Sequence, residues 1–580
     1  MNINQDMPRR AAAAFIAAAT WITATPLAGW AQSPVVSPAP MRHFEYDAEG
    51  RMTLQNNASE SGGSIWRHGY DKLGRRIQSL DALQGLTRFQ HDAMDGLQQV
   101  TDPRGLVTTY ARDGFGNMVT LSSPDTGVSQ LGHDAAGNLL WRQTAGGGMA
   151  TFKHDALNRL VSADHRHPAK PARLYEWFYD QTGAAFGAGI GRLTSIAYPE
   201  FGPGGGQGSA STGFGYSAEG WLMWQQQRPA GSAAALTVSY ARSAAGTVTG
   251  ITYPSGMRVL LDLDGNGRPS ALRVALNVAA QPAPLLTQIT HRPFADQDSE
   301  APGWIWNTAQ GQQVHPRIYD TAGRMIGYRL GSLLRELQYD AADRITAYRH
   351  RDFATQVGRP SSDRAFQYSP TDWLRGGGFA DAVDFSLGYD KNGSRVAWMK
   401  YQLITTVSNR LTIVSSRALQ IGAATISPTS NRLLETSAPR ASYRYDDEGN
   451  LQSDSRLQMA LVHAADGRLA SATQASTGQT AFYSYNNFGQ RTRKALASGE
   501  QRLFVYGEQG ELLGEYTAAL APVREYIWLG PTPVAVVQGG EIYTIHADHL
   551  GAPRVVLDTW GRQRWTWLSD PFGETPPVTD

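Results

Sequence analysis

The sequence predicts an all-β repeat protein, in which antiparallel β-hairpins follow one another in a spiral or a hollow, incompletely closed shell. A short phrase recurs, usually Tyr or His, then Asp, two variable residues, and Gly, Asn or Asp. Its Asp stands at Asp47, Asp71, Asp92, Asp113, Asp134 and Asp155, and each of the last four steps is 21 residues. A fixed period of about 20 to 50 residues is the signature of a repeat architecture.

The columns of the repeat predict a tight turn. Three places after each Asp stands a residue type that tolerates positive backbone φ. These residues are Gly50, Gly74, Asp95, Gly116, Gly137 and Asn158. The short Asp carboxylate can accept a hydrogen bond from the backbone N–H two residues later. We therefore expect the Asp to stabilise a turn, with no catalytic role.

Apolar residues on both sides of each turn predict a strand before it and a strand after it. The apolar residue five places after the Asp is Met52, Leu97, Met118, Leu139 or Leu160, and the residue three places before it is Phe44, Phe89, Tyr110, Leu131 or Phe152. Further turns are expected midway, at residues 102–105, 124–127 and 146–148. Each unit is therefore one hairpin, and the aromatic column is expected to stack as a ladder on one sheet face.

Later copies of the phrase continue the repeat, with irregular spacing between about residues 160 and 440. The Pro/Gly-rich segments 203–206 and 281–284 are expected to form long loops or inserted turns. Residues 42 to 569 could hold about 25 units, or roughly 50 strands, which at ~4.8 Å per strand is too wide for an open, uncurled sheet.

These phrases resemble the YD repeats of the RHS (rearrangement hotspot) family, and the C-terminal part resembles its core-associated signature. That signature comprises His546–Arg554, Trp565, Trp567 and Asp570–Glu574. The resemblance implies a hollow β-shell, which in many members encloses a toxic C-terminal domain. In toxin-bearing relatives the last phrase precedes an autoproteolytic junction and an effector, whereas this sequence stops seven residues after Gly573. The resemblance therefore does not carry the toxin role to this polypeptide.

The sequence suggests four segments. Residues 1–31 are expected to be a signal peptide, because Arg9 and Arg10 precede an apolar Ala-rich segment and a small-residue cleavage site. Residues 32–41 follow as a linker, 42–540 as YD/RHS repeats, and 541–580 as the RHS core-associated signature. An uncleaved anchor or a twin-arginine signal is an alternative. We expect a secreted, periplasmic or cell-surface protein.

Composition excludes some classes of partner. The net charge is +1 from 52 basic and 51 acidic residues, which is not the footprint of a nucleic-acid binder. The sequence has no Cys, so disulfides cannot stabilise an exported fold. The expected partners are a cell-surface glycan or a toxin or effector from another chain. No stable membrane span is expected after signal cleavage.

Several local patterns suggest sites, each with a structural alternative. The segment Asp262–Gly267 matches the first half of a calcium loop, but Arg273 occupies the place of its closing Glu, so a repeat turn is preferred. His546, Asp548 and His549 could hold a metal or act as acid and base, but a tight turn before Pro553 is preferred.

Other residues also have simple structural interpretations. His91, His133 and His154 occupy the Tyr column and are expected to stack on a sheet face. The glycines from Gly202 to Gly208 lack the Lys-Ser/Thr of a phosphate loop and are expected to form a linker. Four Trp outside the clean repeat could stack on sugars, without specifying a site. They are Trp221, Trp224, Trp304 and Trp306.

The leading functional hypothesis is an exported, non-enzymatic shell protein that acts as a scaffold, adhesin or delivery wall. It has no predicted catalytic residue, cofactor or metal. The first alternative is a truncated or split polymorphic-toxin delivery protein without its toxin. The second is a secreted carbohydrate-active enzyme that uses Asp pairs as acid and base.

Overall fold

The computed structural model describes residues 37–57, 64–291, 303–379, 383–408 and 411–579. Residues from Ser37 onward belong to one compact unit. The described residues form 46 β-strands and one short 3-10 helix, η1 (Pro360–Ser362), and no α-helix. The predicted signal peptide, residues 1–31, lies outside the described residues and remains a prediction.

The strands of the N-terminal half are short and closely spaced. They are β1 (Arg42–Tyr46), β2 (Met52–Asn57), β3 (Ser64–Tyr70), β4 (Arg76–Leu80), β5 (Leu86–His91), β6 (Leu97–Thr101), β7 (Val107–Arg112), β8 (Met118–Ser123), β9 (Gly127–His133), β10 (Leu139–Gln143), β11 (Met149–His154), β12 (Leu160–His167), β13 (Lys170–Tyr179), β14 (Leu193–Phe201), β15 (Gln207–Tyr216), β16 (Leu222–Arg228), β17 (Leu236–Arg242), β18 (Val248–Thr252), β19 (Arg258–Leu263), β20 (Pro269–Ala275), β21 (Ala283–Thr290), β22 (Gly303–Thr308) and β23 (Gly311–Tyr319).

The C-terminal half continues the same pattern, with one longer hairpin, β30–β31. Its strands are β24 (Met325–Leu330), β25 (Leu333–Tyr339), β26 (Ile345–Asp352), β27 (Arg364–Tyr368), β28 (Leu374–Phe379), β29 (Val383–Tyr389), β30 (Arg395–Ser408), β31 (Leu411–Ile426), β32 (Leu433–Ser437), β33 (Arg440–Tyr445), β34 (Leu451–Asp454), β35 (Met459–His463), β36 (Leu469–Gln474), β37 (Thr480–Tyr485), β38 (Arg491–Leu496), β39 (Gln501–Tyr506), β40 (Leu512–Tyr516), β41 (Pro522–Leu529), β42 (Thr532–Gln538), β43 (Glu541–Ala547), β44 (Pro553–Leu557), β45 (Gln563–Thr566) and β46 (Val578–Thr579).

Every strand pairs antiparallel with its neighbours in sequence, from β1–β2 at one end to β45–β46 at the other. At a typical repeat turn the register shifts by one residue, as between Gln90 and His91 of β5. This shift is the β-bulge that follows when a turn ends in a residue with positive φ. The result is one open antiparallel sheet, since β1 and β46 are not paired with each other.

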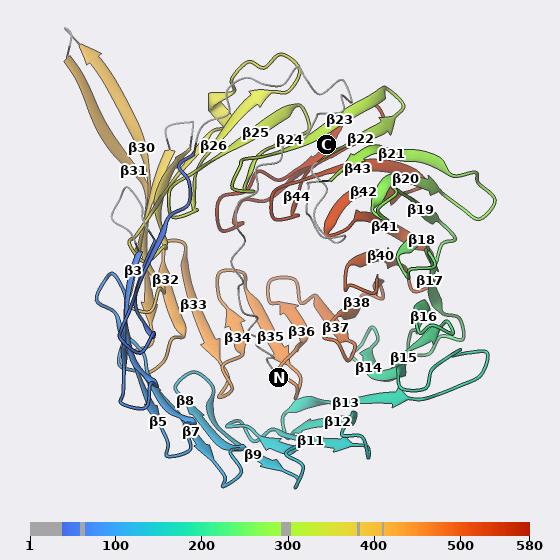
Figure 1. The fold of residues 1–580 in the computed structure, drawn as a ribbon, viewed down its shortest axis with the longest axis horizontal. Helices are drawn as coiled ribbons and strands as arrows, with labels where there is room; N and C mark the ends of the chain where they lie inside the picture. Colours follow the sequence, from blue (N-terminus) through green and yellow to red (C-terminus); the bar gives the residue numbers. More distant parts are fainter. Residues whose placement is uncertain (1–36, 58–63, 292–302, 380–382, 409–410, 580) are drawn as a thin grey trace. The chain divides into compact units, whose positions relative to one another are not determined.

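The sheet winds back upon itself, as hydrogen bonds between distant residues demonstrate. The N–H of Met41 donates to the carbonyl of Ala341 over 2.9 Å, and the Tyr253 hydroxyl donates to the carbonyl of Tyr526 over 2.8 Å. In Figure 1, strands β34–β44 follow the inner side of the path that β5–β23 take. We call the stretch β1–β23 the outer turn of the spiral and the stretch β24–β46 the inner turn, and the contacts between them the seam.

The largest apolar core lies between the two turns. Alternate residues of β17, Leu236, Val238 and Tyr240, are buried in one cluster with Leu503 of β39 and Ile527 of β41. Alternation is expected because successive side chains of a strand point to opposite faces. Where the sheet forms a single layer, as in β2 and β8, every residue has intermediate exposure. Burial therefore comes from winding, since one hairpin layer cannot bury both of its faces.

The structure confirms the predicted all-β fold and corrects its details. Strands continue through the irregular region between residues 160 and 440. The segment 202–206 is a tight hairpin turn between β14 and β15, because the N–H of Gly202 donates to the carbonyl of Gly206 over 2.9 Å. The predicted linker from Gly202 to Gly208 was therefore wrong. In the segment 281–284, the last two residues already belong to β21.

The expected aromatic ladder does not form along the repeat. The column residues Phe89, Tyr110 and Phe152 lie directly opposite Val100, Leu121 and Ala163. In each hairpin the partner is the residue eleven positions later, because the turn and its bulge fix the register. The aromatic residue recurs once in each hairpin, so successive residues of the column lie in different hairpins. The direct cross-strand neighbour of each one lies in its own hairpin and is not aromatic.

The turn glycines provide a test of the repeat assignment. Gly116 has a φ of 86°, and a Cβ at this position would meet no atom within 4 Å. Gly116→Val should therefore destabilise the fold through backbone strain alone, by more than about 1 kcal/mol, whereas Gly116→Asn should be tolerated better. Thermal unfolding of the two variants measures the difference.

Gly114 of the same turn is the matched control. It also has open space around its Cβ position, but its φ is not in the left-handed region. Gly114→Ala should leave the unfolding midpoint close to that of the parent. Equal losses for Gly116→Val and Gly116→Asn would contradict the assignment of the left-handed turn position.

Candidate functional site

Each repeat phrase builds one turn, and its Asp closes that turn. In the turn after β11, Oδ1 of Asp155 accepts hydrogen bonds from the backbone N–H groups of Leu157 and Arg159, both over 2.9 Å. The backbone N–H of Asn158, whose φ is 60°, donates to the carbonyl of Asp155 over 3.0 Å. The same Oδ1 contacts recur at Asp47, Asp71, Asp92, Asp113, Asp134, Asp264, Asp320, Asp340, Asp390 and Asp446. The predicted turn role of the Asp column is confirmed.

An Arg four residues after the Asp connects neighbouring turns. Arg159 donates through Nε to Oδ2 of Asp155 over 2.7 Å and through Nη2 to Asp180 of the next phrase over 2.6 Å. Its guanidinium also lies 4.3 Å from the ring centroid of Tyr179. Such contacts at a partly buried Arg add charge-assisted hydrogen bonds and a cation–π contact. Arg75, Arg324 and Arg344 make the same bridges between successive turns.

The Tyr of the phrase ties each hairpin to the one before it. The Tyr179 hydroxyl donates to the carbonyl of Leu160, the first residue of the preceding strand β12, over 3.1 Å. The same bond occurs from Tyr70, Tyr216, Tyr339, Tyr368, Tyr389 and Tyr506. Tyr, Asp and Arg of the phrase therefore act together as a ladder along one edge of the sheet, which we call the turn ladder.

Hydrogen bonding also sets the charge state of the turn carboxylates. The backbone N–H of Arg159 is the largest cause that lowers the pKa of Asp155, and the Arg159 side chain acts in the same direction, against the effect of burial. In the turn at Asp134 the Asn138 side chain is the largest cause of a lowered pKa. These carboxylates are therefore ionised at neutral pH and engaged with turn groups.

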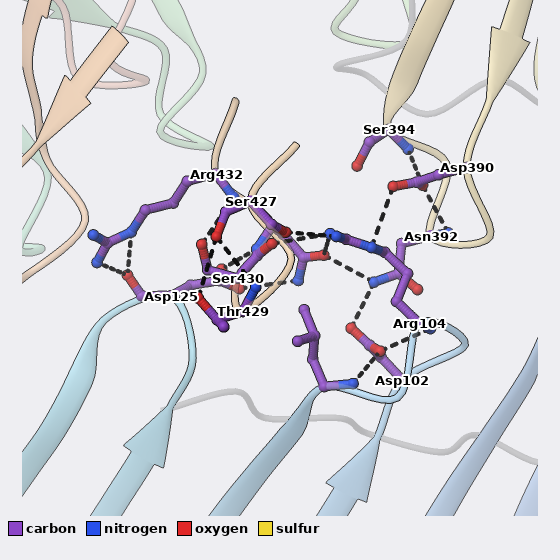
Figure 2. A network of polar contacts seen from close by, with 12 residues as sticks. Asp102, Arg104, Asp125, Asp390, Asn392, Ser394, Ser427, Thr429, Ser430 and Arg432 are labelled. Atoms are coloured by element: carbon purple, nitrogen blue, oxygen red, sulfur yellow. Dashed lines mark hydrogen bonds and ion pairs between the residues drawn. The ribbon is translucent and has the colours of Figure 1, made fainter. Parts of the chain in front are cut away.

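A polar network joins hairpin turns of the outer turn of the spiral to hairpin turns of the inner one (Figure 2). Nη1 of Arg104, in the β6–β7 turn, donates to the carbonyl of Ser430 over 2.9 Å, and Nε lies 3.5 Å from Oδ2 of Asp390. The Asn392 side-chain amide donates to Asp102 over 2.5 Å and to Asn431 over 2.9 Å. The β6–β7 turn is thereby fixed to the β29–β30 and β31–β32 turns.

The β8–β9 hairpin turn contributes to the same network. Both carboxylate oxygens of Asp125 accept hydrogen bonds from Asn431, from its backbone N–H over 2.6 Å and from its side chain over 3.1 Å. Nη2 of Arg432 donates to the carbonyl of Asp125 over 2.5 Å. Further along, Nζ of Lys170 lies 2.8 Å from Asp446 and also contacts Glu448.

The seam therefore changes character along the chain. From Asp102 to Tyr175 it consists of ion pairs and hydrogen bonds, the last from the Tyr175 hydroxyl to Asp466 over 2.7 Å. From β17 to β22 the seam contains the apolar core described above, together with polar contacts such as the hydrogen bond from the Ser255 hydroxyl to Glu525 over 2.6 Å. Burial acts to lower the pKa of Lys170, but hydrogen bonds to the carboxylates of Asp446 and Glu448 outweigh it, so that the pKa is raised.

Comparison with known proteins agrees with this repeat geometry. A family model described as RHS Repeat matches residues 95–128, which span the turns at Asp102 and Asp113. Within this segment the chain carries an RHS repeat. None of the curated protein sequences matches it.

The likeness to solved structures covers nearly the whole chain. The Tc holotoxin pore of Photorhabdus luminescens, carrying a mutant TccC3, superposes with a TM-score of 0.68 at 14% identity over 92% of this chain. The TcdB2-TccC3 structure gives 0.61 at 14% identity over 90%, and TcdB2-TccC3-Cdc42 gives the same values. This chain covers 30% of those chains. At this identity the comparison establishes a shared fold.

The structure separates the three C-terminal residues that could have formed a metal or acid–base site. Asp548 caps a turn, accepting the N–H groups of Leu550 and Ala552 over 2.9 and 3.0 Å, so the predicted turn before Pro553 is confirmed. His549 lies with its Nδ1 3.3 Å from the Tyr328 hydroxyl. Within the described ranges, no three potential metal ligands come together.

His546 lies instead in the seam. Its ring is fully buried, with its centroid 4.5 Å from that of Trp306 and 5.5 Å from that of His315. Burial, the largest cause, lowers the pKa of His546 to about 3, so it is neutral at physiological pH. Trp304 and Trp306 belong to the same apolar core, whereas Trp221 is 40% exposed.

The remaining sequence-predicted positions have structural roles. Asp264 caps a repeat turn through the N–H groups of Asn266 and Arg268, and Arg273 forms an ion pair with Asp262 over 2.6 Å. The turn interpretation of Asp262–Gly267 is thus confirmed. His91, His133 and His154 end three different strands, one per hairpin, so they form no cluster.

Sequence reasoning missed a buried group that includes Arg335, His350 and Asp363. Nε of Arg335 donates to Nε2 of His350 over 2.9 Å, and Nδ1 of His350 lies 3.4 Å from Asp363. No motif indicates this group, because Asp363 follows the η1 helix outside the repeat phrase.

The described part of the chain forms no helix with the length and apolar character needed to span a membrane.

The turn carboxylates provide a second test. Asn486 already occupies the Asp position in one turn and accepts the N–H groups of Phe488 and Gln490 over 3.0 Å. Asp155→Asn should therefore retain the turn, whereas Asp155→Ala should lower the thermal midpoint further, because two backbone N–H groups lose their acceptor. Equal midpoints for the two variants would contradict the capping role.

The same carboxylates predict the acid dependence of stability. Because the folded-state pKa values of Asp155 and Asp134 are lowered, their contribution is present above the unfolded-state pKa of about 4 and is lost as pH falls through the lower folded values. The thermal midpoint should fall between pH 4 and pH 2.5. A midpoint that stays constant over that range would refute this linkage.

Proposed function

We propose that this chain is an exported, non-enzymatic wall protein for toxin delivery, which holds a polypeptide supplied by another chain. The observation that carries the proposal is the wound hairpin sheet, with its turn ladder and seam, together with its likeness to the Tc structures over 92% of the chain. Curved sheets of this width provide an extended surface on each face. A wall of this kind suits enclosure or presentation of another polypeptide.

The use of charged side chains supports a structural role. An acid–base pair for catalysis needs two carboxylates that face a substrate at a defined separation. Here the turn Asp residues accept hydrogen bonds from backbone N–H groups, as Asp155 does. The seam carboxylates pair with Lys170 and with neighbouring amides. Their oxygens are already engaged in holding the wall together.

The compared structures support delivery as the context. They are described as the Tc holotoxin pore, TcdB2-TccC3 and TcdB2-TccC3-Cdc42, and this chain covers 30% of the chains it matches. A piece of that fold can supply the wall while cargo and further walls come from other segments or chains. In this proposal the cargo is a toxin or effector polypeptide.

Protection of cargo from protease tests the proposal. The chain is co-expressed with the polypeptide encoded directly downstream, and the purified complex is treated with protease. The cargo should survive in the complex and be digested when purified alone. Digestion at the same rate in both samples, or failure of the two to co-purify, would reject the delivery role for that cargo.

Seam variants sharpen this experiment. Lys170→Met removes a cation whose side chain is 12% exposed and which joins the outer turn to Asp446. This change should speed digestion of the cargo, because it weakens the polar part of the seam. Arg166→Met, which alters a side chain that is 76% exposed, is the matched control and should leave protection unchanged.

Export is tested separately. The sequence of residues 1–31 has the features of a signal peptide, so mature protein from the periplasm or medium should begin near Gln32. N-terminal sequencing of that material identifies its first residue. Protein recovered there that still begins with Met1 would count against signal cleavage.

A further inference from the structure

A pocket of about 550 Å³ lies between β25–β28 and the segment from Asp548 to Gly573. Its lining includes Tyr348, Phe366, Leu374 and Trp567, together with Arg335. The volume lies within the range of about 300 to 1,000 Å³ typical of small-ligand sites. Aromatic and aliphatic walls favour a ligand with an apolar body.

Arg335 is the buried cation of this pocket. Only 7% of the residue is exposed, and no acidic side chain forms an ion pair with it among the described residues. Its Nε donates to His350, and its Nη1 donates to the Tyr328 hydroxyl over 3.3 Å. Within the part of the chain that the structure describes, Nη2 makes no protein hydrogen bond. A buried guanidinium without an anionic partner is costly, and a bound anion would offset that cost.

The groups around Arg335 hold it in one orientation. The His350 backbone N–H and ring both face Asp363, at 2.8 and 3.4 Å from its Oδ1. This places the acceptor nitrogen of His350 against Arg335, since burial and the Arg335 charge lower the pKa of His350 to about 3. The guanidinium carbon also lies 4.6 Å from the ring centroid of Tyr348, whose ring meets Phe366 edge to face at 5.0 Å.

The other charged side chains that line the pocket have protein partners. Nε of Arg554 pairs with Asp548 over 2.7 Å, and Asp570 accepts the backbone N–H of Glu574 over 2.9 Å. His549 is neutral at physiological pH, because burial lowers its pKa. Arg364 also lines the pocket, but it is less buried than Arg335 and donates through Nη1 to the carbonyl of Asp363 over 3.0 Å. Arg335 is therefore the buried cation that can discriminate between a charged ligand and a neutral one.

We propose that this pocket binds a carboxylate carried on an aromatic body, with Arg335 as the anion-binding group and Tyr348 and Phe366 as the apolar wall. A free aromatic acid and the carboxyl end of a polypeptide that ends in an aromatic residue share this chemistry. Arg suits such a ligand because its planar guanidinium can form two parallel hydrogen bonds with a carboxylate. This site is separate from the seam and does not rest on the delivery role.

Isothermal titration of the full chain with two probes tests the site. N-acetyl-L-phenylalanine carries the carboxylate, and N-acetyl-L-phenylalaninamide has the same body without the charge. The acid should bind at least about tenfold more tightly than the amide, as expected for a charge-assisted pair. Equal affinities, or no binding of the acid at millimolar concentration, would overturn the proposal without any need for a variant.

Two further arms identify the residue and the source of the ligand. Arg335→Met should abolish the preference for the acid over the amide, and Arg166→Met should preserve it. A retained preference in folded Arg335→Met, checked by its thermal unfolding, would overturn the assignment to Arg335. A tetrapeptide ending in Phe identifies the source of the ligand. If it binds more tightly than the acetylated amino acid, the ligand is the end of a polypeptide; if the two bind equally, the ligand is a free acid. Either result supports the site.

Discussion

The fold depends on a carboxylate that accepts two backbone N–H groups within one turn. An unpaired backbone N–H costs free energy when it is shielded from water, and a left-handed residue three places later lets the chain reverse without strain. Asp155 and Asn158 satisfy both requirements in the turn after β11. Because the turn fixes the bulge, it also fixes which residues of the hairpin face each other.

The contacts between hairpins build on that turn. Arg159 uses one carboxylate for its own turn and another in the next phrase, and Tyr179 reaches back to the strand before it. These bonds connect neighbours in sequence, so the sheet can grow from local contacts whose loop-closure cost is small. The seam, in contrast, requires residues far apart in the sequence to meet, such as Lys170 and Asp446, which are 276 positions apart.

The sequence was sufficient for the parts of the structure that are local. The Asp column, the glycine φ values and the turn at Asp264 follow from short-range chemistry, and all three predictions were confirmed. The aromatic ladder was wrong because cross-strand neighbours depend on register within a hairpin. The burial of His546 against Trp306 could not be predicted, because it depends on how the second turn of the spiral lies on the first. Arg335 and His350 escaped notice for a different reason: their chemistry arises from two adjacent strands and an irregular connection that no repeat phrase marks.

The seam has a consequence for how this fold can change length. Every seam contact pairs a defined hairpin of the outer turn with a defined hairpin of the inner one, such as Arg104 with Ser430. Adding or deleting one hairpin between those two points would preserve every neighbouring strand pair and yet shift all later seam partners by one unit. Hairpins added beyond β46 would disturb no such pairing. The number of repeats is therefore constrained by the circumference of the spiral in its interior and is free to vary at its open edge.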